Sequence, residues 1–191
     1  MAICSKSVAF NLDKDIPPLN GKVILVMGGN IGLGKQCVLE FARHNPHQIQ
    51  LASRNLDKAK AAADEIRAQV PDAPIKILEL DLTSFDSVKR AASTVLSASS
   101  RLDILMLNAG IMAIPPGLTS SGYELQFGTN HMGHALLTKL LLPLLTNTAA
   151  ADADVRVVSL SSHGHVYLPR GGFRFDSLRT TADSMGAYWR Y

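Results

Sequence analysis

Residues 22–35 read KVILVMGGNIGLGK, and this stretch decides the fold. The run Lys22–Met27 (KVILVM) is typical of a strand buried on both faces of a sheet. A glycine-rich segment, Gly28–Gly34, follows, and helical spacing begins at Ile31. Glycines between a strand and a helix allow positive φ angles and a close backbone approach to a phosphate. The N-terminus of the helix offers free N–H groups to the same anion. The stretch therefore predicts a strand–loop–helix unit that binds a nucleotide.

The same alternation of short apolar runs and amphipathic stretches continues along the chain. Further strands are expected at residues 47–53, 75–80, 103–107 and 154–160, and helices at residues 31–44, 56–70, 84–97 and 122–145. Strands alternating with helices predict the α/β class, with a doubly wound parallel sheet covered on both faces. The 191 residues predict a single domain over 1–191. Residues beyond Ser161 are expected to form a loop.

The composition excludes several classes of protein. With 47% hydrophobic and 18% charged residues, the chain is not a disordered tail protein. The net charge of +3 (19 Lys+Arg minus 16 Asp+Glu) is too dilute to predict nucleic-acid binding. Cys4 and Cys37 cannot form a disulfide framework, which favours a reducing compartment. No signal peptide or transmembrane segment is recognisable, so we expect a cytoplasmic protein. The six histidines match no zinc spacing, and no metal is expected.

The glycine segment also fits a second nucleotide-binding motif. Gly29–Lys35 reads G-x-x-x-x-G-K, and Asp81 ends an apolar run as a Walker B acid would. That motif needs a Ser or Thr hydroxyl for Mg²⁺ at the next position, where this chain has Gln36. A nucleoside triphosphatase is therefore disfavoured. Glycines that serve strand–helix packing alone remain an alternative.

The end of the second expected strand distinguishes between dinucleotides. A site for NAD places an Asp or Glu about 20 residues beyond the glycine loop, where it binds the ribose 2′-hydroxyl. Here Arg54 lies 26 positions after Gly28 (54 − 28), and Ala52-Ser53-Arg54 contains no acid. Arg54 and Lys35 supply positive charge and Ser53 a hydroxyl, which suits a 2′-phosphate. The pattern favours NADP(H), and an Arg54 that caps a solvated edge is the alternative.

Five landmarks occur in a fixed order along nearly the whole chain. They are Met27–Gly34, read as T-G-x-x-x-G-x-G with Met27 in place of Thr; Asp81-Leu82; Asn108-Ala109-Gly110; Asn130 within Asn130–Gly133; and Ser159-Leu160-Ser161-Ser162. Together they resemble the short-chain dehydrogenase/reductase family, and the segments at Asn130 and Ser162 look most like its retinol-dehydrogenase-like branch. The motif and pocket residues assigned to cofactor binding are Gly28, Asn30, Ile31, Gly32, Leu33, Gly34, Lys35, Ser53, Arg54, Asp81, Leu82, Asn108, Ala109 and Gly110.

The resemblance implies a Rossmann-type fold and hydride transfer between a nicotinamide and a carbonyl or alcohol. In the family, a serine holds the carbonyl oxygen, a tyrosine transfers the proton, and an asparagine organises a water. A lysine four residues after the tyrosine lowers its pKa. The serine and asparagine roles fall on Ser162 and Asn130. The substrate is expected to be a small to medium, largely apolar molecule, and a homodimer is expected through the 122–145 helix.

The tyrosine departs from the family pattern. No tyrosine of this sequence is followed by lysine four positions later. Alignment to the family assigns the catalytic tyrosine to Tyr191 and places the lysine, with the last strands of the sheet, beyond the terminus. An unperturbed tyrosine has a pKa of about 10, so we expect slow turnover or none from residues 1–191. The strand at 154–160 is then expected to leave an edge unpaired. A truncated product and a non-catalytic NADP-binding module are the two alternatives to a working enzyme.

Overall fold

The computed structural model describes residues 9–151, 153–167 and 174–183, and its centre is a parallel sheet. The strands are β1 (Val23–Met27), β2 (Gln48–Ser53), β3 (Ile75–Glu79), β4 (Ile104–Leu107) and β5 (Arg156–Ser159). All neighbouring strands pair in parallel, in the order β3-β2-β1-β4-β5. The chain runs outward from β1 to one edge and then from β4 to the other. This reversal confirms the predicted Rossmann-type sheet.

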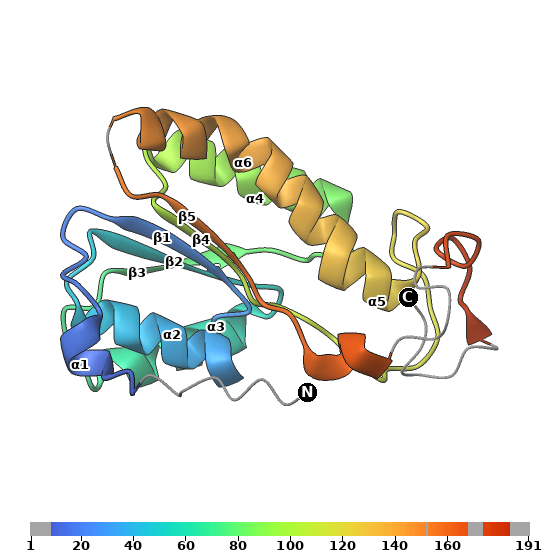
Figure 1. The fold of residues 1–191 in the computed structure, drawn as a ribbon, viewed down its shortest axis with the longest axis horizontal. Helices are drawn as coiled ribbons and strands as arrows, with labels where there is room; N and C mark the ends of the chain where they lie inside the picture. Colours follow the sequence, from blue (N-terminus) through green and yellow to red (C-terminus); the bar gives the residue numbers. More distant parts are fainter. Residues whose placement is uncertain (1–8, 152, 168–173, 184–191) are drawn as a thin grey trace, which may run out of the picture.

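Helices cover both faces of the sheet (Figure 1). On one face lie α1 (Leu12–Asp15), α2 (Gly32–Arg43) and α3 (Leu56–Arg67), and on the other lie α4 (Phe85–Ala98) and α6 (Gly133–Ala150). Successive β1 side chains alternate between two cores. Leu25 and Met27 belong to the core with α4 and α6, while Ile24 and Val26 belong to the core with α2 and α3. Burial on both faces explains why β1 is apolar throughout.

Side-chain caps fix where α3 and α4 begin. The Asn55 side-chain oxygen accepts the Lys58 N–H at 2.8 Å, and the Ser84 hydroxyl accepts the Ser87 N–H at 3.3 Å. Such caps satisfy N–H groups that have no partner within a helix. They account for the close agreement between the expected and observed starts of both helices.

The expected helix over residues 122–145 differs in detail. Its first turn is α5 (Leu125–Phe127), capped by Glu124, and it continues as a π-helical turn, Gly128–Met132, before α6 begins. Pro143 lies inside α6, which extends to Ala150. A short 3₁₀ helix, His163–Tyr167, also replaces part of the loop expected after Ser161.

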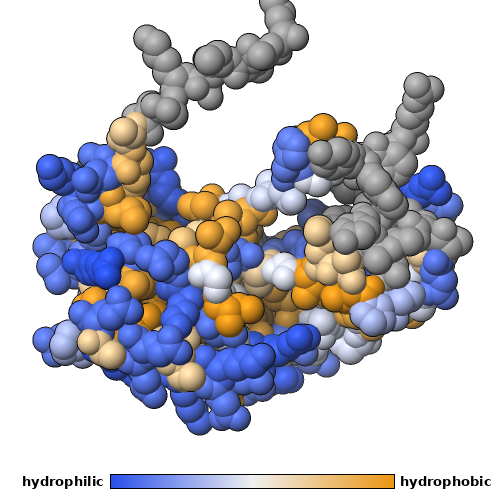
Figure 2. All heavy atoms as spheres, turned by 90° about the horizontal axis from the view of Figure 1, so that it is seen from below, coloured by the Kyte–Doolittle hydropathy of each residue, from blue (hydrophilic) through white to orange (hydrophobic). Residues whose placement is uncertain are grey.

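Strand β5 is exposed along its whole length. Val157 is 48% exposed and Val158 40%, and in the described part of the chain β5 pairs with β4 alone. The expected unpaired edge is therefore present in these residues. The face formed by α2 and α3 is mostly hydrophilic, with hydrophobic residues gathered near a hollow (Figure 2). None of the helices described is long and apolar enough to cross a bilayer.

Candidate active site

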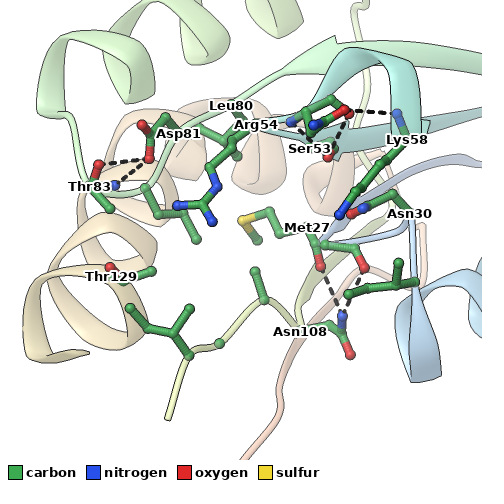
Figure 3. Close-up of a pocket in the computed structure, with 18 residues that line it drawn as sticks. Met27, Asn30, Ser53, Arg54, Lys58, Leu80, Asp81, Thr83, Asn108 and Thr129 are labelled. Carbon is green, nitrogen blue, oxygen red and sulfur yellow. Dashed lines mark hydrogen bonds between the residues drawn. The ribbon is translucent and has the colours of Figure 1, made fainter. Parts of the chain in front are cut away.

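A pocket of about 360 Å³ lies where β1, β2, β3 and β4 end. Figure 3 shows the side chains that line it. It is lined by Met27, Gly28, Asn30, Ile31, Ala52, Ser53, Arg54, Asn55, Lys58, Leu80, Asp81, Leu82, Thr83, Asn108, Ala109, Gly110, Ile111 and Thr129. The carboxyl ends of parallel strands, at the point where strand order reverses, are the usual ligand site in such folds. Ten of the fourteen residues expected to bind a cofactor line this one pocket.

The glycine loop packs closely against the segment after β4. Gly28 has a φ of +70°, and a Cβ there would lie 3.1 Å from Ala109. The Asn108 side-chain amide donates to the carbonyls of Met27 at 3.0 Å and Gly28 at 3.3 Å. A Cβ on Gly34 would clash with the Gly28 carbonyl and the Asn108 amide. These contacts leave a backbone cradle that side chains do not fill.

Helix α2 starts beside this cradle without a side-chain cap. Its N-cap residue is Ile31, which makes no capping hydrogen bond, unlike the caps of α3 and α4. The first N–H groups of a helix carry partial positive charge and need partners. The cradle and the uncapped helix therefore fit the pyrophosphate of a dinucleotide.

Two cationic side chains enter the pocket from the connection between β2 and α3. Arg54 follows the last residue of β2, and Lys58 lies in the first turn of α3; Figure 3 shows both extending from this connection. Neither has a carboxylate partner within the described ranges. The Ser53 hydroxyl is 3.2 Å from both the N–H and the carbonyl oxygen of Asn55, so it also orders this turn.

Lys58 was missed by sequence reasoning, which assigned the second positive charge to Lys35. The Lys35 ammonium pairs with Glu65 of α3. Lys35 does not line the pocket, and neither do Gly32, Leu33 and Gly34. The sequence spacing could have indicated Lys58, because Lys58 lies four residues after Arg54 and in the first turn of a helix capped by Asn55. The cofactor role of Lys35 stays a prediction.

Asp81 lies at the end of β3 with one oxygen engaged. Its Oδ1 accepts the Thr83 N–H at 2.9 Å and the Thr83 hydroxyl at 2.8 Å. The Asp81 N–H donates to the Ser87 hydroxyl at 3.0 Å. These bonds hold the carboxylate at the wall of the pocket (Figure 3), and a carboxylate there is an acceptor available to a ligand.

Asn130 clamps the backbone that follows β4. Its Oδ1 accepts the Ile111 N–H at 2.8 Å, and its Nδ2 donates to the Ile111 carbonyl at 2.8 Å. The neighbours Gly110 and Thr129 line the pocket with Ile111. The Asn130 backbone carbonyl, in turn, lies 2.9 Å from Nδ1 of His134. Asn130 therefore supports the pocket wall through its side chain.

The other two expected catalytic residues are Ser162 and Tyr191. Ser162 is exposed just after β5, and its hydroxyl accepts the Gly164 N–H at 3.1 Å. It does not line the described pocket. Tyr191 lies outside the described residues. Their catalytic roles stay predictions. Within the described ranges, no group of three or more His, Cys, Asp or Glu side chains could hold a metal ion.

Comparison with known proteins identifies the family. The model of the short chain dehydrogenase family matches residues 22–171, which include the pocket and Ser162. The chain belongs to the short-chain dehydrogenase family. Human retinol dehydrogenase 13 is 42% identical over 158 residues, covering 83% of this chain and 45% of that protein. The chain thus spans about half the length of the curated relatives it matches.

Solved structures of short-chain dehydrogenases contain either nicotinamide cofactor. A structure from Escherichia coli CFT073, complexed with NADPH, is 25% identical with a TM-score of 0.58, covering 68% of this chain and 55% of the other. One from Burkholderia phymatum, in complex with NAD, is 21% identical with a TM-score of 0.64, covering 81% and 53%. The second likeness shows the fold alone. The choice of cofactor must be argued from the residues of this chain.

Proposed function

We propose that this chain is the cofactor-binding part of an NADP(H)-dependent short-chain oxidoreductase. The observation that carries the proposal is the charge at the end of β2. Arg54 and Lys58 line the pocket there, and no acid stands among Ser53, Arg54 and Asn55. A carboxylate at this place would favour a ribose 2′-hydroxyl and repel a 2′-phosphate. A guanidinium and an ammonium favour the phosphate.

The remaining walls suit the rest of the dinucleotide. The uncapped N-terminus of α2 and the glycine cradle would hold the pyrophosphate, and Asp81 would accept from the adenine amino group. The backbone at Gly110 and Ile111, fixed by Asn130, would border the nicotinamide half. The cofactor supplies the hydride when it is bound. The chain's own residues bind, orient and exclude water.

Proton transfer is assigned through family membership. We propose that Ser162 holds the substrate oxygen and that Tyr191 donates or accepts the proton. The substrate is proposed to be a small to medium, largely apolar carbonyl compound or alcohol. A homodimer through the helical segment at residues 122–145 and a cytoplasmic location are further parts of this proposal. If the natural protein in its full length binds NADPH without turnover, the protein is a binding module.

The test compares two cofactors and two arginines. Dissociation constants for NADPH and NADH are measured by nucleotide fluorescence for the wild type, Arg54→Ala and Arg90→Ala, an exposed arginine of α4 outside the pocket. Charge-assisted hydrogen bonds contribute about 1.5–3 kcal/mol, so Arg54→Ala should weaken NADPH binding by roughly 10- to 100-fold. NADH binding and the control should change little. Equal affinity of the wild type for the two cofactors would contradict the NADP(H) proposal.

A further inference from the structure

His134 is a buried histidine whose two ring nitrogens stand in different environments. It is 7% exposed and lies one turn after Asn130, near the start of α6. Nδ1 is 2.9 Å from the Asn130 carbonyl oxygen. A carbonyl oxygen accepts and never donates, so Nδ1 must carry the proton. Nε2 is then an unprotonated acceptor, and it is buried with no hydrogen-bond partner in the described residues.

The carbonyl that His134 holds belongs to an unusual turn. Residues Gly128–Met132 form a π-helical turn, in which the Gly133 N–H reaches back five residues to the Gly128 carbonyl. Such turns are rare and are found mostly at functional sites. The His134 imidazole adds a side-chain hydrogen bond to the backbone of this turn, at the Asn130 carbonyl.

Two hydrogen-bonded steps connect the imidazole to the pocket. The first joins His134 to the Asn130 carbonyl. The second is the pair of hydrogen bonds that joins the Asn130 side chain to the N–H and the carbonyl of Ile111, both at 2.8 Å. Ile111 lines the pocket, as do its neighbour Gly110 and the π-turn residue Thr129. A shift of the Asn130 backbone would therefore displace the pocket wall.

We propose that His134 is a positioning residue, whose Nδ1–H holds the Asn130 carbonyl and thereby orients the clamp that fixes Ile111 in the pocket wall. The inference rests on the proposed function insofar as that wall borders a bound nicotinamide cofactor. The hydrogen-bond chain itself is made only of residues of this chain and includes no ligand atom. One readout can therefore test it independently of cofactor binding.

Two substitutions separate the roles of the two ring nitrogens. The side-chain amide of asparagine occupies nearly the place of Nδ1, and that of glutamine nearly the place of Nε2. His134→Asn thus keeps a donor for the Asn130 carbonyl, while His134→Gln removes it. The matched control is Thr138→Val, one turn further along α6, because the buried Thr138 hydroxyl also has no hydrogen-bond partner in the described residues.

The direct readout is hydrogen exchange of the Ile111 amide, measured by NMR. His134→Gln should accelerate this exchange by about five- to tenfold, the equivalent of one lost hydrogen bond. His134→Asn and Thr138→Val should leave it within about twofold of the wild type. The same order should appear in the dissociation constant for NADPH. If the Asn and Gln variants exchange equally, or if Asn is the faster, His134 does not act through Nδ1 and the proposal is overturned.

A measurement on the unaltered protein covers the case in which a variant fails to fold. Long-range ¹H–¹⁵N correlation spectra identify which nitrogen of His134 carries the proton. Protonated Nδ1 and bare Nε2 are expected, and the opposite tautomer would overturn the proposal. A wild type that binds neither NADPH nor NADH would overturn the proposed function. The tautomer and the Ile111 exchange would still decide the role of His134.

Discussion

Asp103 offers the sharpest test of how the sheet is held together. It lies just before β4, and its side chain is fully buried. Oδ2 accepts the Val23 N–H at 2.8 Å and Arg101 Nε at 2.9 Å, while Oδ1 accepts Arg101 Nη2 at 2.5 Å. Its own backbone pairs with Val23 on one side and Arg156 on the other. One residue therefore joins the starts of β1, β4 and β5.

The expected cost of Asp103→Asn follows from these contacts. The amide keeps one acceptor, which serves Val23, but its NH₂ group then faces the Arg101 guanidinium. Breaking a buried ion pair costs about 3–5 kcal/mol, and a single bond to a charged group about 1.5–3 kcal/mol. Arg101 is 42% exposed and can turn toward water, which reduces the loss. We expect Asp103→Asn to lower the free energy of unfolding by about 2–4 kcal/mol, which corresponds to a melting temperature lower by roughly 4–16 °C.

Urea unfolding at neutral pH measures this difference, with Asp86→Asn as the control. Asp86 pairs with Lys89 at 3.4 Å on the exposed face of α4, so the same change should cost less than about 0.5 kcal/mol there. Equal effects of the two substitutions would refute the reasoning.

The pH dependence gives a second check on Asp103. Burial alone would raise the pKa of Asp103, but the Arg101 hydrogen bond, the Val23 N–H and the charges of Arg101 and Lys22 lower it overall. The folded carboxylate thus binds a proton less readily than the unfolded one. Its stabilisation is present above the unfolded pKa of about 3.9 and is lost as pH falls through the lower folded value. The gap between wild type and Asp103→Asn should narrow there.

Three further outcomes are expected. Gly34→Ala should abolish NADPH binding, measured by fluorescence, because its methyl group would clash with the Gly28 carbonyl and the Asn108 amide; unchanged binding would show that the cradle adjusts. Lys58→Gln should weaken NADPH binding by about tenfold and Lys35→Gln by less than twofold, and the reverse order would restore the role first predicted for Lys35. Burial, aided by the charge of His131, lowers the pKa of His134 in the folded protein. The unfolded chain therefore binds a proton at His134 more readily, and the protein loses stability as the pH falls from about 6.5, the pKa of an unfolded histidine, toward the lower folded pKa. Urea midpoints between about pH 7 and 5 should fall less in His134→Asn than in the wild type, and parallel pH profiles would contradict this assignment.

The centre of the fold could be predicted from the sequence because β1 is buried on both faces of the sheet. Such a strand is apolar at every position, so β1 was predicted to within one residue. Helices with a side-chain cap, such as α4 after Ser84, were located nearly as well. The π turn at Gly128–Met132 was not predicted; within it, the Asn130 side chain bonds to Ile111, 19 positions away in the sequence. No periodicity within the segment records that contact.

The pocket was predicted in outline for a similar reason. Sequence motifs locate the ends of β1, β3 and β4, and parallel pairing brings these ends together. The positions of the charged groups on long side chains were harder to predict, because the direction of each side chain depends on the neighbouring helices. Lys35 points to Glu65 on α3, and Lys58 lies in the pocket. In the sequence, each of the two is a lysine close to a motif. Only the packing of α2 against α3 shows that Lys35 pairs with Glu65 while Lys58 lines the pocket.

Two different kinds of force act on this pocket. Asn108 and Asn130 shape it through neutral hydrogen bonds to the backbone of Met27, Gly28 and Ile111. Arg54 supplies charge that makes no comparable bond within the described residues. Neutral bonds fix the positions of loops but discriminate little between NAD and NADP, which differ by one phosphate. The shape of the pocket therefore follows from the two asparagines, which match the family's motifs, and the proposed cofactor preference depends on the charges at the end of β2. A change of preference should be attainable at Arg54 and Lys58 while the asparagine clamps remain intact.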